Sequence, residues 1–158
     1  FQRFPGDHEI LKQSYRLPRE VSLLGNSVVS KIHKRTNKQY KDTGRQGAVN
    51  WILDEEEVDL SIGSWLLLGR NDYHLRRYKT LCEMWSITPG KRVRISTIHG
   101  AKGAEADNVL LTTDMSRRCW ENMIEDPDPE LRVWYVGITR TRNEINVLRP
   151  RTRYNFEL

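Results

Sequence analysis

The sequence predicts an α/β domain of three layers, with helices on both faces of a mainly parallel sheet. Two kinds of segment alternate along the chain. Some have the apolar pattern of strands, and the others repeat apolar residues at three- and four-residue spacing, as helices do. The stretch Ser64 to Gly69 is apolar at most positions, which is typical of a parallel strand buried on both faces. A helical pattern separates it from the strand pattern at 92–98, and this spacing favours a parallel crossover.

The first third of the chain contains a strand, a helix and a basic segment. Residues 9–15 alternate loosely and predict a short strand. Pro18 suits the first position of a helix, which we expect to run to about Lys34. Its apolar face comprises Val21, Leu24, Val28 and Ile32. The basic, turn-rich segment 31–47 is open to two interpretations, a solvated surface loop or a phosphate-contacting surface.

The remaining elements follow from the same patterns. In order, we expect a strand at 49–53, an acidic helix start or turn at 54–57, the strand at 64–69, a helix opened by 70–72, a strand at 92–98, a strand at 108–112, a short helix at 116–124, a helix ending near 139–142 and a last strand at 145–148. The helix after residue 72 should bury Leu75, Tyr78, Leu81, Cys82 and Trp85, and the last helix Leu131, Trp134, Tyr135 and Ile138. The last helix should begin with Asp128 as its N-cap and Pro129 in its first turn. A basic tail follows, with Arg149, Arg151 and Arg153.

Composition excludes several classes of protein. A chain of 158 residues with 37% hydrophobic and 30% charged residues suits one folded domain, which we expect to cover 1–158. The longest apolar run, 65–68, is too short to span a membrane, and no secretory signal opens the chain. The chain also lacks a starting Met, so we expect a piece of a longer protein. Two cysteines without metal spacing and four scattered histidines predict no metal site. The net charge of +5 suits a polyanionic partner.

The stretch Thr97-Ile-His-Gly-Ala-Lys-Gly-Ala-Glu-Ala-Asp107 carries the strongest functional signal. It joins two strand patterns, and its glycines, Gly100 and Gly103, allow backbone N–H groups to approach a ligand closely. Such a turn is expected outside the carboxyl ends of the strands, where open α/β sheets contact ligands. His99, Lys102 and Glu105 offer three different ligand chemistries there. A polar loop without a ligand is the alternative.

Two arginines could bind phosphate. Arg140 lies at the end of the last predicted helix, where its rigid fork suits phosphate, although the helix dipole also favours a surface arginine there. Arg16 ends the first predicted strand, and Tyr15 beside it offers either an aromatic face for a base or a core side chain. No G-x-x-x-x-G-K-[ST] loop occurs anywhere, so any ATP would have to be held by a partner domain.

Together these segments resemble the second RecA-like motor domain of superfamily 1 DNA helicases of the UvrD/Rep type. Residues 12–17 are similar to motif IV of that family, 97–107 to motif V and 135–142 to motif VI, and 65–72 to the strand and turn between motifs IV and V. The resemblance implies a RecA-like fold of the P-loop NTPase type that lacks its own Walker A loop. Only 73–91 occupies the place where the family usually carries an inserted subdomain.

The resemblance also implies a role for each motif residue. Tyr15 would stack on the adenine of ATP, and Arg16 and Arg140 would act as catalytic arginines on the γ-phosphate. Gly103 and Glu105 would also contact the nucleotide, Glu105 through the ribose hydroxyls. The residues implied along a single-stranded DNA path are Arg70, Asn71, Thr97, His99 and Lys102. The Mg²⁺ that accompanies ATP would be held by an upstream RecA-like domain of the same chain.

The expected function is therefore the C-terminal motor domain of an ATP-dependent DNA helicase in the cytoplasm of a bacterium or a phage-infected cell. The isolated fragment should hydrolyse no ATP, because the phosphate-binding loop would lie upstream. The alternative is a non-catalytic nucleic-acid-binding module on the same fold. A pure binding module has no need to combine Arg16, Glu105 and Arg140, so these three residues favour the motor.

Overall fold

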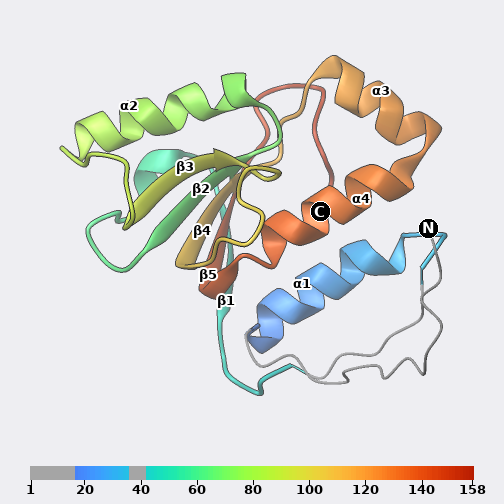
Figure 1. Cartoon of the computed structure of the whole chain (residues 1–158), viewed down its shortest axis with the longest axis horizontal. Coiled ribbons are helices and arrows are strands. Elements are labelled where there is room, and N and C mark those ends of the chain that lie inside the picture. The colour runs from blue at the N-terminus through green and yellow to red at the C-terminus, as the bar shows by residue number, and fades with distance from the viewer. Residues whose placement is uncertain (1–16, 36–41) are drawn as a thin grey trace.

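A single parallel sheet organises the part of the chain that the computed structural model describes, residues 17–35 and 42–158. Its strands are β1 (Ala48–Ile52), β2 (Trp65–Gly69), β3 (Val93–Thr97), β4 (Ala106–Thr112) and β5 (Thr141–Leu148), in the order β1-β5-β4-β2-β3. Every neighbouring pair is parallel, which confirms the predicted parallel sheet (Figure 1). The strand predicted at 9–15 lies outside the described residues.

Helices cover both faces of this sheet. They are α1 (Arg19–Ser30), α2 (Arg76–Met84), α3 (Arg117–Glu125) and α4 (Pro127–Ile138), with short 3₁₀ turns η1 (Glu55–Glu57) and η2 (Asp72–Leu75). Figure 1 shows α2 on one side of the sheet and α1 and α4 on the other. Each side has its own apolar core, so the predicted three-layer architecture is confirmed. No helix in the described ranges has the length and apolarity needed to cross a bilayer.

Strand β2 shows why a continuous apolar run predicts a central parallel strand. All five of its residues are buried. Leu66 and Leu68 enter the core beneath α1 and α4, whereas Trp65 and Leu67 enter the core beneath α2. Burial of each leucine side chain contributes about 1.5–3 kcal/mol. A strand that alternated apolar and polar residues would place polar side chains in one of the two cores. The run is therefore apolar at successive positions.

Helix α4 begins two residues before its predicted start. Asp126, not Asp128, is the N-cap, and its carboxylate accepts a hydrogen bond from the Asp128 backbone N–H at 3.4 Å. Pro127 then takes the first helical position, where its missing N–H costs nothing. The sequence offers two consecutive Asp-Pro pairs, and local pattern cannot choose between them. Asp128 instead accepts hydrogen bonds from the backbone N–H groups of His33 (2.8 Å) and Lys34 (2.9 Å).

Two other boundaries differ from the prediction. Helix α1 ends at Ser30 rather than near Lys34, because the chain there turns toward Asp128. Trp85 was expected on the buried face of its helix, but it is 39% exposed. Helix α2 ends at Met84, and Ser86 adopts a left-handed conformation with φ of 53°, so Trp85 falls just past the last turn. The cysteines Cys82 and Cys119 are free thiols.

The contact of Asp128 with the end of α1 predicts a pH-dependent contribution to stability. Hydrogen bonds from the Lys34 and His33 backbone N–H groups lower the pKa of Asp128 below its ordinary value of 3.8. The stabilisation is therefore present above about pH 4 and is lost as the pH falls through the lower folded-state pKa. We expect Asp128→Asn to lower the urea midpoint at pH 7 and to have a smaller effect near pH 3. Asp72→Asn, at an exposed site, is the control, and an equal loss for Asp128→Asn at both pH values would contradict the assignment.

Candidate functional site

The segment 97–107 connects opposite ends of the sheet. Thr97 is the last residue of β3, at the carboxyl end, whereas Ala106 begins β4 at the amino end. Because both strands are parallel to β2, which lies between them, the chain has to run back along the sheet. Ile98 and Ala101 are buried in the core beneath α4 on the way. The expectation that the whole turn lies outside the carboxyl ends is therefore wrong, because Glu105 directly precedes β4 at the amino end.

Backbone hydrogen bonds within this segment hold its turn. The Thr97 hydroxyl accepts from the Gly100 N–H at 3.1 Å, and the Thr97 carbonyl accepts from the Ala101 N–H at 2.9 Å. Gly103 has φ of 82°, the left-handed region that favours glycine, and a side chain there would meet open space. His99 and Lys102 are exposed. They border a cavity of about 180 Å³, whose other lining residues are Ile98, Arg132, Val133 and Val136.

Glu105 and Arg140 meet at the amino ends of β4 and β5. The Ala106 N–H donates to the Arg140 carbonyl at 3.1 Å, which places the residues before the two strands side by side. The Arg140 side chain is partly buried, and its Nε donates to the Val136 carbonyl at 3.0 Å. The Glu105 carboxylate accepts from Nε and Nη2 of Arg142, each at 3.4 Å. A carboxylate and two guanidinium groups therefore share this end of the sheet.

The start of α1 lies at the same end. The Arg45 guanidinium donates to the Arg142 carbonyl, and the Arg45 carbonyl accepts from the Arg19 N–H at 3.0 Å. The Thr43 hydroxyl donates to the carbonyl of Leu17, the first described residue, at 3.1 Å. Tyr15 and Arg16, the remaining predicted nucleotide contacts, lie outside the described residues.

Arg70 and Asn71, both predicted on the DNA path, make internal contacts at the carboxyl end of β2. Arg70 donates through Nε and Nη2 to both carboxylate oxygens of Glu130, at 2.8 and 2.7 Å, and this pairing raises the pKa of Arg70. Their side chains are only 15% and 8% exposed. Asn71 accepts from the Ser116 N–H at 2.8 Å and contacts the sulfur of Cys119 at 3.7 Å. The two residues thus tie the turn after β2 to the first turns of α4 and α3.

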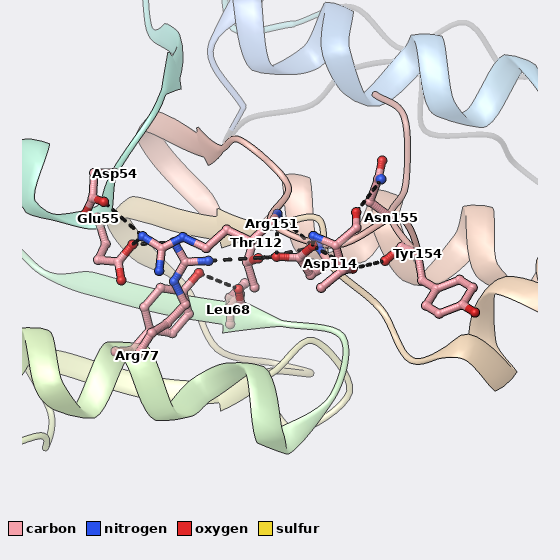
Figure 2. A network of polar contacts seen from close by, with 11 residues as sticks. Asp54, Glu55, Leu68, Arg77, Thr112, Asp114, Arg151, Tyr154 and Asn155 are labelled. Atoms are coloured by element: carbon pink, nitrogen blue, oxygen red, sulfur yellow. Dashed lines mark hydrogen bonds and ion pairs between the residues drawn. The ribbon is translucent and has the colours of Figure 1, made fainter.

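A second polar network at the carboxyl end fixes the basic tail (Figure 2). The Arg151 guanidinium contacts the carboxylates of Asp54 and Glu55, each at 2.9 Å, and Arg77 pairs with the same Glu55. The Arg151 backbone N–H donates to Asp114 at 3.0 Å. Arg151 is therefore held within the domain and is not a mobile cation of a tail. The sequence patterns did not indicate Asp114, although this residue follows the buried run of β4 within two residues.

No group of three or more His, Cys, Asp or Glu side chains within 17–35 and 42–158 is arranged to hold a metal ion. The predicted site residues that the structure describes therefore fall into two sets. Gly103, Glu105 and Arg140 lie toward the amino ends of β4 and β5, whereas Arg70, Asn71 and Thr97 lie at the carboxyl ends of β2 and β3. His99 and Lys102 lie on the segment between them.

Comparison with known proteins agrees with this architecture. Residues 74–148 match the UvrD-like helicase C-terminal domain family. The fold is similar to the C-terminal domain of a possible DNA helicase from Lactobacillus plantarum WCFS1, with a TM-score of 0.54 and 16% identity over 85% of this chain and 86% of that one. It is also similar to the arterivirus nonstructural protein 10 helicase, solved with DNA, with a TM-score of 0.51 and 12% identity over 88% of this chain.

The chain spans 25% of the arterivirus protein, and at these identities both structures show the fold alone. No curated protein matches the chain. The family match includes the complete segments 97–107 and 135–142, which contain Gly103, Glu105 and Arg140. The five-stranded parallel sheet covered on both faces is that of a RecA-like domain. Residues 74–148 therefore carry the sequence pattern of a UvrD-like helicase C-terminal domain, within a fold similar to that of such a domain.

Proposed function

We propose that this domain is the second motor domain of an ATP-dependent DNA helicase. It would supply arginines to ATP bound by an upstream domain and would form part of a single-stranded DNA track. The observation that carries the proposal is that Glu105 and Arg140 lie in neighbouring segments at the amino ends of β4 and β5, which the 3.1 Å bond from the Ala106 N–H to the Arg140 carbonyl holds together. A domain with a purely structural role has no need of this combination on one edge.

The hydrogen-bonding groups on this edge fit one side of a nucleotide. The Glu105 carboxylate can accept hydrogen bonds from ribose hydroxyls, and the Arg140 guanidinium can donate to phosphate oxygens. Gly103 leaves the backbone open to close approach, since a side chain there would meet nothing within 4 Å. Bound ATP would supply a phosphoanhydride bond whose hydrolysis drives movement between domains. The phosphate-binding loop and the Mg²⁺ ligands would come from the upstream domain, and Tyr15 and Arg16 would complete this side.

The DNA track would follow the segment 97–107 toward the carboxyl end of the sheet. His99 and Lys102 are exposed. The polar imidazole and the basic ammonium group suit sequence-independent contacts to phosphates. Arg70, Asn71 and Thr97 would shape the track, since each also has an internal partner. The net charge of +5 is consistent with a polyanionic strand.

One segment would then link the two ligands. Residues 97–107 run between the ends of the sheet and pack on α4, the helix that ends just before Arg140. Ile98 contacts this helix so closely that a side chain at Gly137 would lie 3.2 Å from its Cδ1. A displacement of Arg140 would therefore be transmitted through α4 and Ile98 to His99.

The test compares the isolated domain with the intact protein. We expect DNA-stimulated ATP hydrolysis and strand separation by the intact protein and no hydrolysis by residues 1–158 alone, because the domain lacks a phosphate-binding loop. A cooperative unfolding transition of the isolated domain is the control for its fold. Robust turnover by the isolated domain would refute the proposal. DNA binding by the intact protein without any hydrolysis would favour the non-catalytic binding module.

A further inference from the structure

The turn after β2 presents one aromatic side chain to solvent at the carboxyl end of the sheet. Tyr73 lies in η2, two residues after Asn71, and is 50% exposed. Arg70 and Asn71 face inward, Arg70 on Glu130 and Asn71 on the first turn of α3, whereas Asp72 is exposed beside Tyr73. The large exposed side chain of this turn is therefore a phenol rather than a cation.

Contacts behind Tyr73 hold its ring. The His74 imidazole packs against it with ring centroids 4.0 Å apart and an interplanar angle of 41°. His74 is partly buried, and burial lowers its pKa below 6.5, so the supporting ring is neutral at physiological pH. Arg70 and Asn71 fix the backbone that carries both rings. A side chain with two rotatable bonds and a supported face is a rigid contact surface with a low entropic cost of binding.

The position of Tyr73 relates it to the proposed DNA track. Gly69, at the end of β2, is in register with Thr97, at the end of β3. A cavity of about 590 Å³ includes Asp72 together with Ser96 and Thr97, so η2 and the start of the 97–107 segment border the same space. Exposed arginines lie in the first turns of the helices on either side, Arg76 in α2 and Arg118 in α3. Exposed aromatic rings together with basic side chains are typical of surfaces that bind single-stranded nucleic acid.

We infer that Tyr73 is a base-stacking residue for single-stranded nucleic acid at the carboxyl end of β2. The identity of the partner rests on the proposed function. A neutral phenol contributes little to phosphate binding, whereas every base has a face that can stack on it. The contact would therefore add affinity without sequence preference, and Arg70 and Asn71 would position the ring. Removal of one such stacked ring weakens binding by about tenfold.

The test separates base stacking from phosphate contacts in the intact protein. The probes are a fluorescent oligodeoxythymidine and an abasic deoxyribose-phosphate strand of equal length. We expect Tyr73→Ala to weaken binding of the thymidine strand about tenfold and to leave binding of the abasic strand unchanged. Tyr73→Phe should bind both strands as the wild type does. The matched control is Trp85→Ala, an exposed aromatic at the other end of α2, which should change neither affinity.

Two results would overturn the inference. They are unchanged binding of the thymidine strand by Tyr73→Ala, and an equal loss on both strands, which would make the effect structural. The unfolding midpoint of each variant, measured alongside, identifies a structural loss. The proposed function fails by a different observation, namely wild-type protein that binds the thymidine strand but hydrolyses no ATP, and the comparison of the two strands holds in that case as well.

Discussion

Arg140→Ala in the intact protein is expected to reduce DNA-stimulated ATP turnover by about 10³-fold, the lower end of the range for arginines that stabilise phosphoryl transfer. The Nε of Arg140 donates to the Val136 carbonyl at 3.0 Å, so the end of α4 fixes the plane of the guanidinium. A group held in this way meets developing charge without reorganising. The loss should therefore fall mainly on kcat rather than on KM, because the contact would be strongest in the transition state.

Two variants make the Arg140 result specific. Arg140→Lys retains the charge but not the planar fork and should recover only part of the turnover. Arg153→Ala removes an exposed arginine from the segment after β5, away from both the nucleotide edge and the DNA track, and should leave turnover unchanged. Loss of the bond to Val136 costs about 1 kcal/mol of stability, so Arg140→Ala should remain folded at 25 °C. Turnover of Arg140→Ala equal to that of the wild type would remove this residue from the mechanism.

The elements that sequence predicts well are those whose pattern is set by their immediate surroundings. The continuous apolar run of β2 follows from burial between two cores, and the alternation of strands with helices follows from a parallel sheet covered on both faces. The start of α4 was predicted two residues late because Asp126-Pro127 and Asp128-Pro129 carry the same local signal. The choice between them depends on His33 and Lys34, which are far away in the sequence.

The site could be predicted only in part for the same reason. Motifs predict roles for Glu105 and Arg140, but the separation of these residues from Thr97 depends on the order of β3, β2 and β4 in the sheet, which no motif contains. The ion pair of Arg70 could not be predicted, because its partner Glu130 lies sixty residues away in the sequence. Arg151 appeared as part of a free basic tail because Asp54 and Glu55 precede it by nearly one hundred residues. Long-range ion pairs leave no periodic trace in a sequence.

The network in Figure 2 predicts a large loss of stability on removal of the Asp114 carboxylate. This carboxylate is 2% exposed and accepts hydrogen bonds from the backbone N–H groups of Arg151 and Thr152 and from the Thr152 hydroxyl, at 2.9–3.0 Å. It also lies 3.8 Å from the Arg77 guanidinium. Asp114→Ala would leave these partly buried donors and the largely buried Arg77 guanidinium without this acceptor, so we expect a loss of about 3–5 kcal/mol in the free energy of unfolding.

Urea denaturation at pH 7 measures this loss directly, and Asp59→Ala is the matched control. Asp59 is exposed and, among the described residues, accepts hydrogen bonds from Ser61 in its own turn, so its removal should lower the free energy of unfolding far less. Asp114→Asn retains one acceptor oxygen but points an amide donor at a neighbouring donor. Its loss in the free energy of unfolding should therefore fall between those of Asp114→Ala and Asp59→Ala. A cost for Asp114→Ala no greater than that for Asp59→Ala would mean that the segment 149–155 is held by the packing of Phe156 on Trp134, whose rings are 4.9 Å apart, and not by the carboxylate.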